Sequence, residues 1–122
     1  MVVGRMKVRA WLKDRKEMIK VYNIDFDKKM INTNSAWRCF DEVELMLFIG
    51  LFDLKGTEIY EGDIVQFRDS YDYKHLWKGF VDFADASFRI NGGFIKHYRW
   101  IDYDVEVIGN IYENPELLEE VE

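Results

Sequence analysis

The chain has 122 residues, of which 48% are hydrophobic and 16% aromatic. This is enough apolar material for a core and excludes a disordered chain. Seventeen basic residues stand against 23 acidic ones, a net charge of −6 at pH 7, so the chain as a whole would repel phosphate. The one cysteine, Cys39, cannot form an internal disulfide, which is typical of a reducing cytoplasm.

Neither a membrane span nor a signal peptide is expected. The longest apolar run, residues 43–49, contains Glu44 and is far shorter than the roughly 20 residues that a membrane helix needs. No apolar segment follows the basic residues Arg5 and Lys7, as a signal peptide would require. We therefore expect a cytoplasmic protein.

Alternating apolar and polar residues predict strands in the first part of the chain. Residues 5–12 predict a strand with one wet face, and residues 18–22 its hairpin partner. A short strand pair is expected around the polar turn at residues 27–29. Residues 43–49 predict a strand buried on both faces, and a helix over residues 41–48 is the alternative.

Turn residues divide the following part into short strands. Gly50 is predicted to end the preceding strand. Asn91-Gly92 is the strongest hairpin signal, because this pair readily adopts the positive φ angles of a type I′ turn. The expected strands cover residues 58–60, 64–68, 77–83, 87–90, 94–101 and 105–112.

The last residues predict a short helix that would close the fold. Asn114 is a candidate N-cap, Pro115 suits the first helical position, and Glu116 places a negative charge in the first turn.

Charge is distributed unevenly along the chain. Residues 1–20 hold seven basic and two acidic residues, a net charge of +5, whereas residues 49–122 hold seven basic and 16 acidic residues, a net charge of −9. Opposite charges of this kind favour head-to-tail contact between subunits, so we expect a homo-oligomer. Strands whose exposed faces carry charged residues for solubility give the same uneven charge distribution, without any contact between subunits.

Candidate catalytic and metal-binding residues are weak. Glu61 and Asp63 flank a glycine in a tight turn that enters a strand, a pattern that indicates a structural role. Cys39, His75 and His97 lack the regular spacing of a zinc site, and Cys39 is expected to be a small buried residue. We predict no enzyme activity, no cofactor and no metal.

A candidate binding surface combines the basic N-terminal strand with a later group of aromatic and basic residues. Exposed aromatic rings with nearby cations are the features that single-stranded nucleic acids recognise. The residues are Arg5, Lys7, Arg9, Trp77, Arg89, Lys96, Arg99 and Trp100.

Two segments of the chain are long and distinctive: IGLFDLKGTEIYEGDIV at residues 49–65 and VEVIGNIYENPELL at residues 105–118. They resemble the YopX family, whose members are small proteins encoded by phages and prophages of Gram-positive bacteria. The weaker similarity at residues 7–11, 16–18 and 38–50 extends the resemblance over nearly the whole chain. The resemblance implies a mostly-β protein in the cytoplasm of a bacterial host and carries no catalytic residues. Residues 69–100 follow no family pattern.

These observations predict one mostly-β domain spanning residues 1–122. An SH3-like barrel is expected at residues 49–112, with an N-terminal β-hairpin layer at residues 1–48 and a short C-terminal helix at residues 113–122. The expected function is a non-enzymatic phage or prophage accessory protein that binds a host or phage protein. The alternative is a module that binds single-stranded or duplex nucleic acid. No membrane contact is expected.

Overall fold

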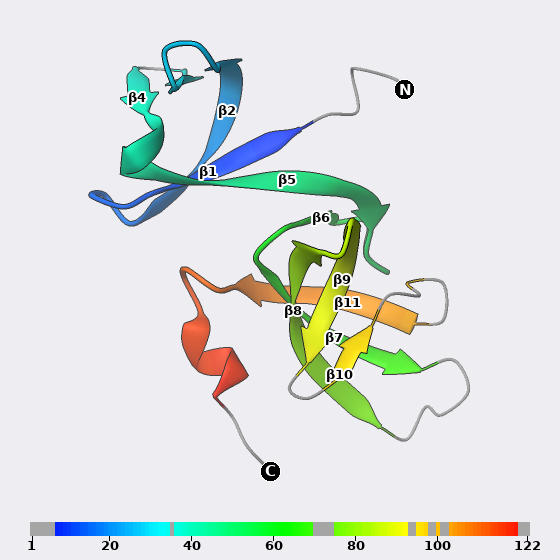
Figure 1. Cartoon of the computed structure of the whole chain (residues 1–122). Helices are drawn as coiled ribbons and strands as arrows, with labels where there is room; N and C mark the ends of the chain where they lie inside the picture. The colour runs from blue at the N-terminus through cyan, green and yellow to red at the C-terminus, as the bar shows by residue number, and fades with distance from the viewer. Residues whose placement is uncertain are drawn as a thin grey trace. The chain divides into compact units, whose positions relative to one another are not determined.

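The computed structural model describes residues 7–34, 36–69, 75–92, 95–97, 100 and 103–119, with only the backbone described at residues 69 and 95–97 (Figure 1). The chain divides into two compact units, Met1–Phe48 and Ile49–Glu122. Most of the described residues lie in antiparallel strands, which confirms the mostly-β class. The part of the chain that is described contains no helix that is long and apolar enough to cross a membrane.

The strands of the first unit follow the predicted hairpins. The strand order is β4-β3-β2-β1-β5, whereas β6 (Glu58–Tyr60) belongs to the second unit. The strand predicted for residues 43–49 is confirmed, but it is not buried on both faces, since Leu45 and Leu47 are 37% and 42% exposed. The alternative of a helix over residues 41–48 is wrong, because only η2 (Phe40–Glu42), a 3-10 helix, precedes the strand there. The bounds are β1 (Val8–Leu12), β2 (Glu17–Asp25), β3 (Met30–Thr33), β4 (Trp37–Cys39) and β5 (Val43–Phe52).

The first unit has its own small core. Its fully buried apolar residues are contributed by β1, β3 and β5, and partly buried residues of β2 and η2 pack against them. Apolar burial of this kind holds the sheet face together. The buried residues are Ala10, Leu12, Ile31 and Val43.

Strand β5 continues beyond the predicted end at Gly50. Gly50 has a φ of +89°, yet the strand runs on through it to Phe52. Glycine adopts this angle without steric cost. The prediction that Gly50 ends the strand is therefore wrong, because its unusual φ is accommodated inside the strand.

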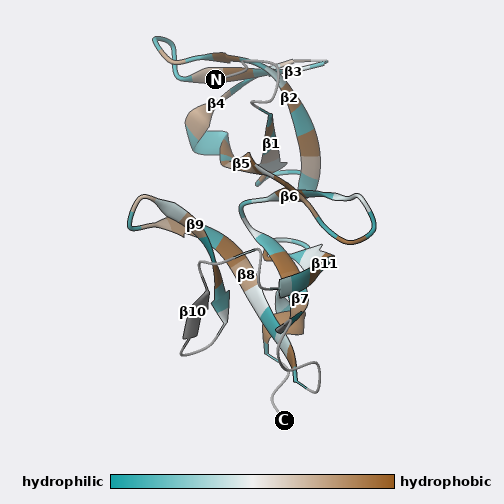
Figure 2. Cartoon of the chain, turned by 90° about the vertical axis from the view of Figure 1, so that its right-hand side faces the viewer, coloured by the Kyte–Doolittle hydropathy of each residue, from teal (hydrophilic) through white to brown (hydrophobic). Residues whose placement is uncertain are grey.

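The second unit is built on an antiparallel sheet with the strand order β10-β9-β8-β7-β11. Hydrophobic and hydrophilic residues alternate along its strands (Figure 2), and the apolar set packs around the buried Phe67, Val81 and Ile90. The bounds are β7 (Asp63–Asp69), β8 (Leu76–Ala84), β9 (Ser87–Gly92), β10 (Ile95–His97) and β11 (Tyr103–Asn110).

This sheet is open, whereas the sequence predicts a closed SH3-like barrel. In the described residues β10 and β11 are the two edges and do not pair with each other. The edge of β11 instead receives the turn after β5, where the Leu54 amide donates to the Val105 carbonyl at 3.0 Å. A turn occupies part of the edge that a closing strand would need.

The type I′ turn lies at a different hairpin from the predicted one. Asp85 and Ala86 have φ angles of 54° and 62° and connect β8 to β9, where Ala84 pairs with Ser87. Asn91 and Gly92 are strand residues that pair with Lys96 and Ile95. The hairpin predicted here is therefore present, since β9 and β10 pair antiparallel, but Asn91 and Gly92 belong to the strand β9, and residues 93–94, which connect the two strands, lie outside the described residues.

The predicted C-terminal helix is a single 3-10 turn, η4 (Pro115–Leu118), with Pro115 in its first turn and Glu116 as its acidic residue. Asn114 occupies the N-cap position, but its side chain makes no capping bond. Its Oδ1 accepts the Asn110 amide at 3.2 Å instead. This side chain fastens the end of β11.

Candidate functional site

The turn after β5 is organised by the buried carboxylate of Asp53. Its Oδ1 accepts hydrogen bonds from the amides of Lys55 and Thr57, each at 2.9 Å. Its Oδ2 accepts the Val107 amide of β11, also at 2.9 Å. Only 8% of Asp53 is exposed, and a buried carboxylate needs such donors. Asp53 therefore binds the turn to the sheet edge.

The environment of Asp53 favours its ionised form. Burial alone raises the pKa of the Asp53 carboxyl, but the amides of Val107, Thr57 and Lys55 together lower the pKa below its ordinary value. Hydrogen bonds to the charged form outweigh the loss of hydration. Asp53 is thus an anion used for structure, with its acceptor sites already occupied by the backbone.

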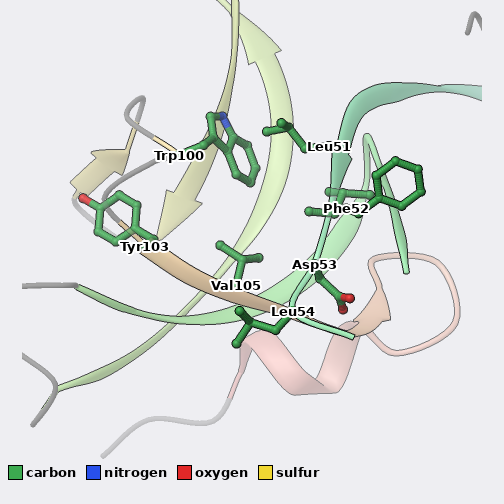
Figure 3. A pocket seen from close by; sticks show the side chains of 8 residues that line it. Leu51, Phe52, Asp53, Leu54, Trp100, Tyr103 and Val105 are labelled. Carbon is green, nitrogen blue, oxygen red and sulfur yellow. The ribbon is translucent and has the colours of Figure 1, made fainter. Parts of the chain in front are cut away.

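An apolar pocket of about 490 Å³ lies beside this turn. In Figure 3, Leu51 and Trp100 point toward one another across it, while the carboxylate of Asp53 points away. The Trp100 indole is held in place because its Nε1 donates to the Phe88 carbonyl at 3.1 Å. The lining residues are Leu51, Phe52, Asp53, Leu54, Ile59, Trp100, Tyr103 and Val105.

The rim of the pocket exposes large apolar side chains. Leu51 is 40% exposed, Phe52 58% and Leu54 70%. In Figure 3 the Phe52 ring points away from the pocket, whereas Leu51 and Leu54 lie on the side of Trp100, Tyr103 and Val105. Exposed apolar side chains beside a pocket are poorly solvated, a feature that marks binding sites. We call Leu51, Leu54, Trp100 and Tyr103 the apolar rim.

A smaller polar hollow of about 310 Å³ lies on the other side of Leu54. Its wall includes Asp104 and Glu106. Glu106 forms an ion pair with Lys55 at 2.7 Å and accepts a bond from Gln66 at 3.1 Å. Lys55 and Gln66 lower the pKa of Glu106, and Glu106 raises the pKa of Lys55.

The predicted aromatic and basic surface near residues 77–100 is largely engaged within the protein. Arg89 is held by Asp82, at 2.8 Å from Nε to Oδ1, and by Asp85 at 3.6 Å. Trp77 and Trp100 pack against the core of the second unit. The structure therefore gives these residues roles in the fold.

The other residues of the predicted surface are separated from this group in the chain. Lys7 and Arg9 belong to the first unit, where the Lys7 ammonium lies 5.7 Å from the centre of the Phe48 ring. Arg5 and Arg99 lie outside the described residues, and only the backbone of Lys96 is described.

The candidate catalytic and metal-binding residues have structural or separate positions. Asp63 is 2% exposed and accepts the Tyr60 amide at 2.7 Å, which fits the predicted turn role. Cys39 is exposed, so the prediction of a buried residue is wrong. Among the described residues, no three His, Cys, Asp or Glu side chains come together as a metal site.

Sequence reasoning named Trp100 as a binding residue but missed the other residues of the apolar rim. Its residues come from the end of β5, from Trp100 and from the start of β11. The only available signal was the run Leu51-Phe52 followed by Leu54 inside a segment with turn character. Because Gly50 was expected to end the strand, these apolar residues had no assigned face.

The fold and the site define an all-β protein of two antiparallel sheets with an apolar pocket at one sheet edge. The chain belongs to the YopX protein family, whose model matches residues 7–119. Among curated proteins, none is significantly similar to it.

Two solved structures share this fold. Protein EF1440 from Enterococcus faecalis is 29% identical, with a TM-score of 0.67, and the match covers 93% of this chain and 97% of that one. Protein yopX from Bacillus subtilis is 21% identical, with a TM-score of 0.64, and the match covers 95% of this chain and 98% of that one. The latter similarity concerns the fold alone.

Proposed function

We propose that this protein is a non-enzymatic accessory protein of a phage or prophage, which binds another protein in the cytoplasm of the bacterial host. The apolar rim is the observation that carries this proposal. Tryptophan and tyrosine in a pocket are the residue types on which binding energy concentrates in protein interfaces. The rim places Trp100 and Tyr103 beside exposed aliphatic residues.

The net charge of the second unit indicates which kind of partner protein would bind in the pocket. Residues 49–122 carry a net charge of −9, and complementary charge steers partners to a surface. The partner is therefore a host or phage protein with a segment that carries a large apolar side chain flanked by lysine or arginine. The apolar side chain enters the pocket, and its cationic neighbours face the acidic unit.

The use of buried carboxylates in the second unit supports a binding role over a catalytic one. Among the residues of this unit whose side chains are described, Asp53 and Asp63 are the buried acids, and both accept bonds from backbone amides. A catalytic acid or base needs an accessible proton site near the substrate. Neither carboxylate offers one toward the pocket.

Site-specific photo-crosslinking tests this proposal. Leu54→p-benzoylphenylalanine places the reactive ketone at the 70% exposed edge of the pocket, and the same residue at Phe83 is the control, because Phe83 is also exposed, at 54%. Irradiation in infected host cells should link the position-54 variant to a defined peptide of one partner. Mass spectrometry should find an apolar residue next to lysine or arginine in that peptide.

Two results would overturn the proposal. Equal crosslinking from positions 54 and 83 would show that the rim is not selective. A crosslinked peptide from residues 1–20 of a second copy would identify the expected homo-oligomer as the occupant. Light scattering on Leu54→Lys, which disrupts the rim at its 70% exposed residue, would then show loss of the oligomer.

A further inference from the structure

We propose that the first unit binds single-stranded nucleic acid on the face of its sheet opposite the core. Tyr22 and Trp37 stack on bases, and Lys20 contacts the phosphate backbone. This site lies in a different unit from the apolar rim. Aromatic rings on a β-sheet surface bind unstacked bases in this way, with cations tracking the backbone.

A β-bulge creates the exposed surface on β2. The pairing of β2 with β3 shifts between Val21 and Asn23. Val21 and Ile24 both pack against the first-unit core although they are three residues apart. The two residues between them, Tyr22 and Asn23, are consequently both exposed, Tyr22 to 56%. A bulge re-aims side chains in this manner.

A second exposed ring, that of Trp37, lies beside the side-chain amides of two asparagines in the sheet. Asn23 lies opposite Asn32, and Asn32 lies opposite Trp37. Residues directly opposite each other in antiparallel strands share a face, with Cβ atoms about 5 Å apart. The Trp37 ring is 50% exposed. The three residues thus offer a stacking surface and two amides that can hydrogen-bond base edges.

Charge favours a polyanion at this unit. Residues 1–48 contain ten basic and seven acidic residues, a net charge of +3, in contrast to the net −9 of residues 49–122. Lys20 is exposed on β2 between Ile19 and Val21, which pack toward the core, so it lies on the same face as Tyr22. The net charge of the whole chain is −6 and does not reveal this local excess of cations, which is why charge is compared unit by unit.

The acidic residue nearest these asparagines has a local role. Asp25 lies two register positions beyond the Asn23–Asn32 pair, opposite Met30. Its Oδ1 accepts the Lys28 amide at 3.0 Å within the turn between β2 and β3. Lys28 and Lys29 in that turn are exposed, as is Asp27, so the two carboxylates at this end of the sheet are accompanied by two cations.

Fluorescence anisotropy tests the proposal with the full chain. The probe is fluorescein-labelled oligo(dT) of about 15 nucleotides, the upper range of one small binding site. We expect saturable binding at about 50 mM salt that weakens by about 200 mM salt, as phosphate contacts require. Trp37→Ala and Tyr22→Ala should each weaken binding about tenfold or more, the loss of one stacked base.

Matched variants separate stacking from a change in folding. Trp37→Phe should retain binding within about threefold, because phenylalanine still stacks, while quenching of tryptophan fluorescence by the oligonucleotide should decrease. Phe83→Ala removes an exposed ring of the second unit and should leave the affinity unchanged. Flat titrations at low salt, or wild-type affinity in Trp37→Ala with an unchanged circular dichroism spectrum, would overturn the proposal.

Discussion

The Asp53 carboxylate accepts the Val107 amide at 2.9 Å across a separation of 54 residues. This bond joins the two segments that most resemble the YopX family, residues 49–65 and 105–118. A second bond beside it links the Leu54 amide to the Val105 carbonyl at 3.0 Å. The two segments are therefore parts of one structural element, the edge of the second-unit sheet.

Asp53→Asn should destabilise the second unit by about 2 kcal/mol. Asparagine keeps one carbonyl oxygen, so its amide group must face either the Val107 amide or the pair from Lys55 and Thr57. Hydrogen bonds to a charged acceptor contribute roughly 1.5–3 kcal/mol each. Urea denaturation followed by tryptophan fluorescence at pH 7 measures the change in the free energy of unfolding.

The control for Asp53 is the same substitution on the neighbouring strand. Asp104→Asn lies on β11 and is partly exposed, so it should change the free energy of unfolding by less than about 0.5 kcal/mol. Equal losses in the two variants would mean that charge, and not the network around Asp53, determines the effect.

The contribution of Asp53 should disappear in acid. Because the folded-state pKa of Asp53 is lowered, its stabilisation is complete above the unfolded pKa of about 3.9 and is lost as pH falls through the folded pKa. The stability difference between wild type and Asp53→Asn should thus be constant above about pH 5 and shrink below about pH 4. Denaturation curves at intervals from pH 7 to pH 3 measure it; a difference that grows in acid would contradict this assignment.

Local signals in the sequence predicted the strands well. The alternation in residues 5–12 and the tight turn between Glu61 and Asp63 that enters a strand both correspond to observed elements. The apolar pattern also marked the segment that becomes β5, although it left a helix open. Each of these features depends on residues that are neighbours in the chain, which periodicity and turn propensity describe.

The sites depend on long-range geometry that no local pattern contains. The bulge at Tyr22 places Tyr22 and Asn23 on the same side of the sheet. Simple alternation would assign these two residues to opposite faces. The pocket forms only when Leu51, Trp100 and Tyr103 meet from distant segments. The open sheet likewise follows from the contact of the Asp53 turn with β11, which the barrel prediction did not include.

Gly79→Ala should destabilise the second unit by roughly 1–3 kcal/mol, the usual cost of overpacking. A Cβ at Gly79 would lie 2.6 Å from the Asn91 carbonyl oxygen and 2.8 Å from Ile90 Cγ2. The Asn91 oxygen belongs to the backbone of β9, so relief requires the strand to move. Urea denaturation measures the loss.

The control for Gly79 is Gly56→Ala. A Cβ at Gly56 meets nothing within 4 Å, but its φ of +84° strains any other residue. It should cost about 1 kcal/mol through backbone strain alone. If Gly79→Ala retained wild-type stability, the close approach of β8 and β9 at this position would be wrong.

Ala86→Gly should stabilise the second unit by about 0.5 kcal/mol. Ala86 has a φ of 62° at the second position of the β8–β9 turn, where a Cβ is unfavourable and type I′ turns prefer glycine. Relief of that strain exceeds the greater entropy that glycine gives the unfolded chain. Ala84→Gly, two residues earlier in β8, has no strain to relieve and should destabilise by about 0.5–1 kcal/mol. Thermal unfolding of the two variants should therefore shift in opposite directions, and a shift of both to lower temperature would show that Ala86 does not occupy the left-handed region.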